Sequence, residues 1–385
     1  MRGMTADTGR LSTEGAFAVL ARAKELERKG KRILHFEIGE PDFPTPGNIV
    51  LAAIKALVEG YTHYVPSQGI LELRQAVCEY ISKTRGFEPK PEQVLISPGA
   101  KPIMFYSILA TIEPGDEVIH PDPSYPMYSS LVRYRGAKEV PIPLKEEKEF
   151  RMTAEDVNER VTDKTKMIIL NSPHNPTGGV LTKEDVRGIS EIAEDKDIFL
   201  LSDEVYSQLV YEGEHHSVAN HDCAMERTVL IDGFSKTWAM TGWRLGFCVA
   251  PPKLVERMTL IQINVVSCAC SFAQLAGVEG LLGPQEEAKK MREEFAKRRE
   301  VIVKGLNEVP GFRCLKPRGA FYVFPNIRGT GKTSDELEKY LLEEFGIATL
   351  SGRSFGPGGE GFLRFSYASS IETIKEGIEK LKEAF

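Results

Sequence analysis

The chain has 385 residues, of which 42% are hydrophobic and 27% charged, so it has the composition of a globular protein with material for about two to three domains. Its formal net charge of -6 excludes an overall basic surface that would bind nucleic acid or anionic membranes. No apolar run is long enough to span a membrane, and the N-terminal stretch MRGMTADTGR lacks an apolar signal core, which predicts a cytoplasmic protein.

The N-terminal part of the chain is predicted to be helical, then extended, then helical again. Residues 12–30 have the pattern of an amphipathic helix that stops at a glycine, and an extended stretch follows at 33–38. The segment GEPDFPTP, which begins at Gly39, has three prolines and is therefore rigid and non-helical. Helices are expected at 48–60 and 70–84, with Tyr64 in the loop between them.

The middle of the chain alternates short apolar strands with helices. Strands are predicted at residues 94–97, 117–120, 166–171, 198–202, 228–232 and 247–250. This alternation is typical of an α/β fold, in which helices cover a mostly parallel central sheet and ligands bind at the carboxyl ends of the strands. We expect residues 46–284 to form this large domain, and residues 1–45 and 285–385 to combine in a smaller α+β domain.

Small or polar residues directly follow several of these strands. The turn Gly99-Ala100-Lys101 exposes backbone N–H groups at a helix N-terminus, which favours a phosphate; Lys101 either adds charge or points to solvent. Asp203 ends a buried strand, where a carboxylate is costly to desolvate unless a cation meets it, although a helix-capping aspartate fits the same pattern. Asn175, in the sequence NPTG, has an amide that can donate to a phenolate-type oxygen.

The stretch SKTWAMTGWRLG, residues 235–246, combines an amine and a guanidinium near the end of a predicted strand. A lysine at the edge of a buried strand, here Lys236, is partly desolvated, which lowers its pKa and makes its amine a nucleophile or base. Arg244 nearby suggests an anionic ligand such as a phosphate. Taken singly, the two residues could equally be a surface lysine and a structural salt-bridge arginine.

Two further residue types suit a flat, charged ligand. Tyr125 is held between prolines and forms a rigid aromatic plate that can stack on a heterocycle, whereas Tyr128 is interpreted as a core residue. Arg364 lies in an apolar strand predicted at residues 360–367, where a structural ion pair is the simpler explanation.

The CxC pair Cys268 and Cys270 lacks the second ligand pair that zinc needs, so we expect buried thiols and no metal site.

In this order, the motifs resemble those of class I aminotransferases, the aspartate aminotransferase family of fold type I. The shared features are the Ser-Lys and Met-x-Gly-Trp-Arg run at residues 235–244, NPTG, the DEVY that begins at Asp203, and the Arg-x-Ser-Tyr-Ala that begins at Arg364. The resemblance implies pyridoxal 5′-phosphate as cofactor, bound to Lys236 as a Schiff base. It also implies a homodimer with active sites at the interface, and transfer of an amino group from an L-amino acid of aspartate, aromatic or alanine type to a 2-oxo acid, with 2-oxoglutarate as the expected acceptor.

The resemblance also implies a role for each site residue. Lys236, Asp203 and Tyr206 would be catalytic, with Asp203 on the pyridine nitrogen and Tyr206 on the ring's phenolic oxygen. Tyr125 and Val205 would pack on the two ring faces. The residues expected around the phosphate are Gly99, Ala100, Lys101, Ser235, Arg244 and, from the neighbouring subunit, Tyr64. The residues expected around the substrate are Gly39, Asn175 and Arg364.

Two departures from the family pattern and two alternative functions complete this interpretation. Relatives often have serine three residues before the lysine, where this chain has Gly233, so a compensating role of Ser235 stays open. Residues 262–271 contain no arginine to bind a distal carboxylate across a dimer, which argues against aspartate specificity by that means. A lyase of the same fold or a non-catalytic sensor domain would share many of these residues.

Overall fold

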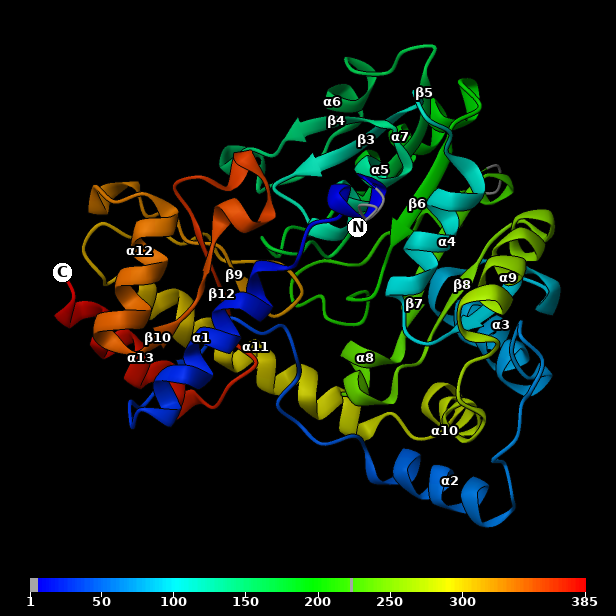
Figure 1. The fold of residues 1–385 in the computed structure, drawn as a ribbon, viewed down its shortest axis with the longest axis horizontal. Coiled ribbons are helices and arrows are strands. Elements are labelled where there is room, and N and C mark those ends of the chain that lie inside the picture. Colours follow the sequence, from blue (N-terminus) through cyan, green and yellow to red (C-terminus); the bar gives the residue numbers. More distant parts are fainter. Residues whose placement is uncertain (1–5, 222–223) are drawn as a thin grey trace, which may run out of the picture.

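A seven-stranded sheet forms the centre of the computed structural model, which describes residues 6–221 and 224–385 (Figure 1). The strand order is β2-β8-β7-β6-β5-β3-β4. The strands are β2 (Val94–Ser97), β3 (Glu117–Asp122), β4 (Lys138–Pro143), β5 (Thr165–Asn171), β6 (Phe199–Asp203), β7 (Thr228–Gly233) and β8 (Gly246–Val249). Strand β8 is antiparallel to both of its neighbours and the other neighbouring pairs are parallel, so the predicted mostly parallel sheet is confirmed.

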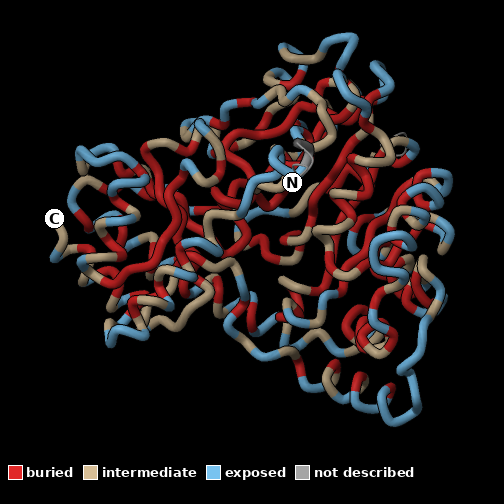
Figure 2. The backbone as a smooth tube through the Cα atoms, viewed as in Figure 1, coloured by how far each residue is buried: buried red, intermediate tan, exposed pale blue. Residues whose placement is uncertain are grey.

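Helices cover both faces of this sheet, because its central strands are apolar on both sides. One face packs against α4 (Lys101–Thr111), α5 (Pro126–Arg135) and α9 (Pro252–Val266). The other face packs against α3 (Leu71–Arg85), α7 (Lys183–Asp195) and α10 (Ser271–Leu282), with α6 (Ala154–Asn158) on α7 and α2 (Gly47–Val58) on α10. Figure 2 shows the sheet strands buried between these layers. The sheet therefore presents only its strand ends to ligands.

The C-terminal third of the chain forms a second, smaller region together with the N-terminal segment. Its helices are α11 (Glu286–Leu306), α12 (Ser334–Tyr340) and α13 (Ile371–Glu383), beside α1 (Gly15–Arg28). Its strands are β9 (Tyr322–Val323), β10 (Ile347–Ala348), β11 (Leu350–Ser351) and β12 (Leu363–Ser366). They form the antiparallel sheet β11-β12-β9 and a parallel pair between β10 and β1 (Leu34–His35).

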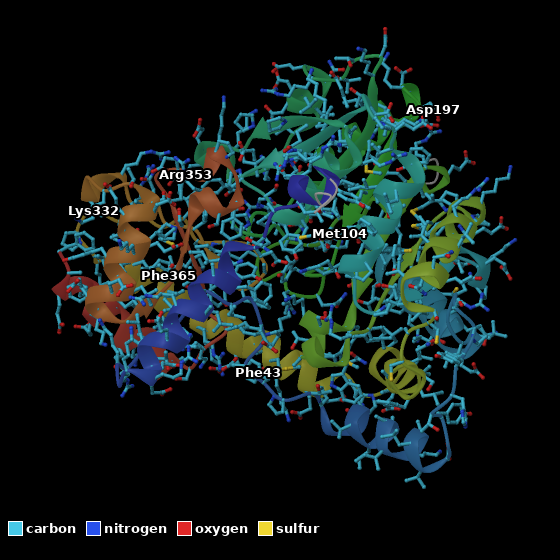
Figure 3. The ribbon with its side chains drawn as sticks, viewed as in Figure 1. Phe43, Met104, Asp197, Lys332, Arg353 and Phe365 are labelled. Atoms are coloured by element: carbon cyan, nitrogen blue, oxygen red, sulfur yellow. The ribbon has the colours of Figure 1, made fainter. Side chains whose placement is uncertain are left out.

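The core of this region joins residues from both ends of the chain. Phe36 packs with Phe295, Phe365 and Ile378 in one apolar cluster. Figure 3 shows Phe365 inside this part of the molecule, whereas Lys332 and Arg353 lie toward its outer side. Residues near position 36 are thus held against residues more than 250 positions later, as the strand pairing Leu34↔Ile347 also requires.

Several elements differ from the sequence-based expectation in length. The helix predicted at 12–30 begins at Gly15, which leaves the Glu14 side chain outside the helix as its N-cap residue. The extended stretch 33–38 forms a strand of two residues, because the segment pairs with β10 only there. The edge strand β4 was not predicted; it contains two prolines and a single buried residue, Ile142, which weakens its strand signal.

The expectation of two buried thiols in the CxC pair is wrong for Cys270, which is exposed, while Cys268 is half-buried. The reason is their position in the turn between α9 and α10, where a positive φ of 64° at Ser267 directs the chain across the surface. Within the described ranges 6–221 and 224–385, no three His, Cys, Asp or Glu side chains are grouped to hold a metal ion. In the same ranges, no helix has the length and apolarity needed to cross a bilayer.

Candidate active site

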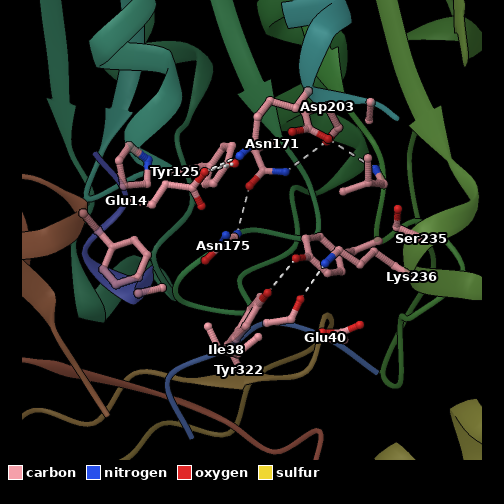
Figure 4. A pocket seen from close by; sticks show the side chains of 18 of the residues that line it. Glu14, Ile38, Glu40, Tyr125, Asn171, Asn175, Asp203, Ser235, Lys236 and Tyr322 are labelled. Atoms are coloured by element: carbon pink, nitrogen blue, oxygen red, sulfur yellow. Dashed lines mark hydrogen bonds and ion pairs between the residues drawn. The ribbon is translucent and has the colours of Figure 1, made fainter. Parts of the chain in front are cut away.

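A cavity of about 480 Å³ opens at the carboxyl ends of β5, β6 and β7 (Figure 4). This volume suits a small-molecule ligand or cofactor. Three parts of the chain line it: the N-terminal segment at residues 14–17 and 38–40, the strand ends of the central sheet, and parts of the smaller region between residues 322 and 364. The cavity therefore lies where the two regions of the molecule meet.

Asp203 is the last residue of β6 and its side chain is buried. One carboxylate oxygen accepts a hydrogen bond of 2.6 Å from the hydroxyl of Tyr128, and the other accepts one of 3.3 Å from the backbone N–H of Val205. Burial raises the pKa of Asp203 to about 6, against the opposing effect of the Tyr128 hydrogen bond. Among the described residues no side chain forms an ion pair with it, so a cationic ligand group would stabilise this carboxylate.

Lys236 lies in the short helix α8 (Phe234–Thr237), which directly follows β7. Its amine donates a hydrogen bond of 2.6 Å to the backbone oxygen of Gly39 and lies 5.8 Å from the ring centre of Tyr206. Burial, together with the positive charge of Arg364, lowers the pKa of Lys236 to about 8. At neutral pH about a tenth of the molecules would then carry the amine in its neutral, nucleophilic form.

Arg364, on β12, places a buried guanidinium at the cavity wall. The guanidinium lies between the rings of Tyr322 and Phe355, 4.4 and 4.9 Å from their centres. It donates a hydrogen bond of 3.1 Å to Asn175 Oδ1 and another to the backbone oxygen of Glu37. Its Nε is buried without a partner in the described part of the chain, so the group retains hydrogen-bonding capacity for an anion.

Gly39 allows the N-terminal segment to approach this site closely. A Cβ at this position would collide with the hydroxyl of Tyr322. That hydroxyl in turn shares a hydrogen bond of 2.7 Å with the hydroxyl of Tyr206. Burial raises the pKa of Tyr206 well above its usual value, so the phenol stays protonated and can donate. The backbone of Gly39 is thus held between Lys236 and the tyrosine pair. Figure 4 shows Lys236 and Tyr322 near Ile38 and Glu40, the chain neighbours of Gly39.

A second part of the cavity is positively charged and lies at the N-terminus of α4. Gly99 has a φ of +94°, and a Cβ there would collide with the guanidinium of Arg244. Arg244 is itself held by a 2.8 Å hydrogen bond to the backbone oxygen of Thr241. Ala100, Ser235 and Arg244 all line the cavity here. Backbone N–H groups at a helix N-terminus next to an arginine form a phosphate-binding arrangement.

Gly233, which stands where relatives often have serine, lies close to the neighbouring strand β8. A Cβ at Gly233 would come within 3.3 Å of the Cα of Gly246 on the neighbouring strand β8. Gly246 has even less room, since a Cβ there would meet the backbone of Gly99 and Ala100. The two glycines let β7, β8 and the Gly99 turn approach one another. The hydroxyl of Ser235 remains available at the cavity wall.

The side chains of Tyr125 and Val205 line the cavity near Asp203. The ring of Tyr125 packs edge-on against Tyr128, at 5.7 Å between centres, which fixes its plane. Its hydroxyl donates a 3.0 Å hydrogen bond to Glu14, and the amine of Lys101 forms an ion pair with the same carboxylate oxygen. The side chain of Lys101 is therefore paired with the N-terminal segment.

Most residues singled out in the sequence come together at this one cavity. Those that line it are Gly39, Ala100, Lys101, Tyr125, Asn175, Asp203, Val205, Tyr206, Ser235, Lys236, Arg244 and Arg364. Gly99 lies directly beneath the Arg244 guanidinium. Tyr64 does not belong to this group, because it follows α2 on the surface and is 89% exposed.

Sequence reasoning missed three residues of the site. Tyr128 was interpreted as a core residue and is buried in the core, but its hydroxyl donates to Asp203. Glu14 was not singled out because the sequence placed it inside the helix predicted at 12–30, whereas the helix begins at Gly15. Tyr322, in the sequence GAFY at residues 319–322, was given no role, although its alternation in a short strand could have placed it on the same face as the cavity.

The family of aminotransferases of class I and II matches residues 31–381 of this chain. The aspartate aminotransferase of Pyrococcus horikoshii is 42% identical over 363 residues, which cover 94% of this chain and 92% of that protein. The aromatic-amino-acid aminotransferase 2 of Thermococcus litoralis is 40% identical over 355 residues, with 91% of each chain covered.

Solved structures give the same result. The structure of the aspartate aminotransferase from Thermus thermophilus with maleate superposes with a TM-score of 0.96 at 34% identity, and the match covers 100% of both chains. Sequence and fold similarity therefore extend over nearly the whole chain.

Proposed function

The chain belongs to the aminotransferase class I and II family, whose members transfer amino groups with pyridoxal 5′-phosphate, and from this premise we propose how its residues divide the reaction and which substrates it accepts. The proposed donors are L-amino acids of the aspartate, aromatic or alanine type, and the proposed acceptor is 2-oxoglutarate. Relatives named for aspartate and for aromatic amino acids, at similar identity, support this range. The single observation that carries the assignment is the grouping of Lys236, Asp203 and Arg364 at one cavity.

The residues present fit this cofactor chemically. The buried carboxylate of Asp203 lacks a cationic partner among the described side chains, and a protonated pyridine nitrogen is such a cation. The amine of Lys236 has a lowered pKa, as a residue that binds an aldehyde covalently requires. Arg244 and the N-terminus of α4 suit the phosphate, with Gly99, Ala100 and Ser235 around it.

When bound, the cofactor supplies an electron sink for the pair released at the substrate Cα. Arg364 binds the substrate carboxylate through its planar guanidinium, and Asn175 and Gly39 orient the same group. Lys236 Nζ removes the proton from Cα of the donor and, in the reverse half of the cycle, donates a proton to Cα of the acceptor, a role that suits a pKa near the working pH.

The other residues hold the pyridine ring of the cofactor in place and keep its nitrogen protonated. Asp203 keeps the ring nitrogen protonated, since the buried carboxylate is most stable beside a cation. Tyr206 and Asn175 donate hydrogen bonds to the phenolic oxygen, and Tyr125 and Val205 pack on the two ring faces. Lys101 acts through Glu14 and Tyr125 rather than at the phosphate, as its ion pair suggests.

We propose that the enzyme works as a homodimer in which Tyr64 of the partner subunit reaches the phosphate. The exposed position of Tyr64 supports this, because the side chain does not line the cavity of its own subunit. The helix that precedes it, α2, exposes Leu51, Ile54 and Val58, an apolar surface that a partner subunit would cover. Sedimentation of the loaded enzyme, and the cofactor affinity of Tyr64→Phe, test both statements.

We also propose that the chain divides into a large cofactor-binding domain at residues 46–284 and a smaller domain made of residues 1–45 and 285–385. The pairing of β1 with β10 and the packing of Phe36 with Phe295 support this division.

A stopped-flow panel of amino acids tests the function. Mixing the loaded enzyme with each donor should convert the aldehyde form of the cofactor to its amine form, with 2-oxoglutarate reversing the change. If no donor produces the amine form, the transaminase assignment fails. A lyase would instead release elimination products, which product analysis detects.

A further inference from the structure

Behind the cavity lies a buried cluster of charges formed by Arg85, Glu204, Asp232 and His215, here called the Arg85 cluster. The guanidinium of Arg85 has no solvent exposure and donates to Glu204 at 3.1 Å and to Asp232 at 2.7 Å. His215 contacts the same oxygen of Glu204 at 2.9 Å. None of the four residues lines the cavity described above.

The two carboxylates of the cluster are the chain neighbours of active-site positions. Glu204 directly follows Asp203, and Asp232 stands four residues before Lys236. Asp232 also accepts a hydrogen bond of 2.7 Å from the backbone N–H of Gly233. Any movement of Glu204 or Asp232 is therefore passed along the backbone to Asp203 or Lys236.

The strand ladder joins these two segments up to their last paired residues, and the backbone N–H of Glu204 still donates a hydrogen bond of 2.8 Å to the backbone oxygen of Ile231. The pairing of β6 with β7 ends at Asp203↔Ile231. Beyond that point Asp232 and Gly233 pair only with β8 on the other side. Arg85, from the end of α3, bridges the two segments just past the last paired residues, and Ser207 reinforces the bridge by accepting from Arg85 at 2.6 Å.

The bridge is also an electrostatic requirement. Two buried carboxylates close together repel each other strongly unless a cation lies between them. Burial raises the pKa of Asp232 to about 6 even with Arg85 beside it. Burial alone would also raise the pKa of Glu204, but His215 and Arg85 together lower it to about 2. Glu204 is further bonded to Ser217 and Ser202, at 2.7 and 3.0 Å, so it depends less on Arg85 than Asp232 does.

We propose that Arg85 is a positioning residue for the amino-group transfer, which fixes the Asp203 carboxylate and the Lys236 amine relative to each other by tying the ends of β6 and β7 together. The proposal rests on the roles proposed above for Asp203 and Lys236. Arg85 lies outside the cavity, but its loss should still slow the chemical step. The reason is that small displacements of the reacting groups lower the rate strongly.

The test compares Arg85→Gln with the double variant Arg85→Gln/Asp232→Asn in the cofactor-loaded enzyme. Arg85→Gln leaves Asp232 unpaired, so kcat should fall about 10- to 100-fold with KM for the amino acid changed less than about twofold. The absorption spectrum of the loaded enzyme without substrate should change its ratio of protonated to unprotonated bands at fixed pH. In the double variant the excess charge is removed while Glu204 keeps His215, but the bridge between the two strand ends is still missing, so the melting temperature should recover while kcat stays low and the spectrum stays altered.

Arg299→Gln is the matched control. Arg299, on α11, is a buried arginine that pairs with Glu212 at 2.9 Å, and neither residue lines the cavity. Its loss should lower the melting temperature without altering the spectrum or kcat. If Arg85→Gln behaves like Arg299→Gln, Arg85 is purely structural and the proposal is overturned; the same holds if the double variant regains wild-type kcat and spectrum, because the charge on Asp232 and not the bridge would then set the rate.

If Arg85→Gln does not fold, Arg85→Lys decides the question. Lysine keeps the charge but reaches one carboxylate at a time, so a folded enzyme with lowered kcat and an altered spectrum supports the proposal, and wild-type values overturn it. Failure of the function itself has a different signature: the wild-type enzyme would then show no conversion of the cofactor with any amino acid.

Discussion

The two walls of the cavity are built in different ways. The wall that carries Asp203 and Lys236 consists of the ends of neighbouring strands in one sheet, with a buried core behind it. The facing wall combines Glu14, Gly39 and Arg364, which come from the N-terminal segment and from the smaller region. Changes in the first wall should therefore affect the chemistry of every substrate alike, whereas changes in the second should alter affinity and substrate choice.

The largest effect is expected from Lys236→Ala, in the strand-end wall. Loss of the amine removes both the covalent attachment of the cofactor and the base at Cα, so kcat should fall by about 10⁴-fold or more for all donors. Borohydride reduction should no longer attach the cofactor to the peptide that contains residue 236. Lys166→Ala, which removes a lysine packed on Phe199 outside the cavity, should behave as wild type. A label recovered on another peptide would refute the assignment.

Asp203→Asn should give the next largest loss in the same wall. The neutral amide cannot keep the ring nitrogen protonated, so kcat should fall about 10²- to 10³-fold, the size found when one preorganised electrostatic contact is removed. The loss should be similar for acidic, aromatic and small donors, as measured by stopped-flow half-reactions. A loss confined to one class of donor would contradict the proposed separation of the two walls.

Arg364→Lys, in the facing wall, should mainly raise KM. Replacing the planar fork by an ammonium loses one charge-assisted hydrogen bond of about 1.5–3 kcal/mol, which corresponds to about a 10- to 100-fold higher KM for amino and oxo acids. The matched control is Arg328→Lys, because Arg328 stacks on Phe362 of the same region outside the cavity. Initial-rate kinetics with several donors separate KM from kcat. A change in kcat alone would argue against carboxylate binding by Arg364.

The pH dependence of cofactor binding tests the amine in the strand-end wall. The neutral form reacts with an aldehyde, and burial lowers the pKa of Lys236 to about 8. The rate at which the cofactor-free protein binds pyridoxal 5′-phosphate should therefore rise about fivefold from pH 7 to 8 and level off above. An ordinary lysine would instead give a nearly tenfold rise per pH unit up to about pH 10. That second profile would show that the amine is not desolvated.

The smallest effect is expected from Glu14→Gln, in the facing wall. Glu14 neutralises Lys101, so its loss should free the ammonium for a second carboxylate and raise kcat/KM for dicarboxylic donors relative to phenylalanine about two- to fivefold. This range corresponds to up to about 1 kcal/mol for a partly exposed ion pair. Lys101→Gln should shift the ratio in the opposite direction. Equal ratios in both variants would show that the pair does not select substrates.

The sequence predicted the strand-end wall better than the facing one for a physical reason. Asn175, Asp203 and Lys236 each follow a run of apolar residues, and parallel strands bring their carboxyl ends to one edge whatever the details of packing. Tyr128 lies on helix α5, and its hydroxyl reaches Asp203 through the core. Nothing in the local sequence pattern distinguishes Tyr128 from an ordinary core tyrosine.

What the sequence determined by itself was the α/β order of the elements, the strand-end positions of Asp203 and Lys236, and, through the resemblance of its motifs, the cofactor and type of reaction. Tertiary structure alone decided that Glu14 meets Lys101 and Tyr125, and that Arg85 joins two carboxylates 119 and 147 positions away. Local patterns record which face of an element is apolar. Partners between distant elements depend instead on how the helices pack against the sheet, which no single stretch of the chain specifies.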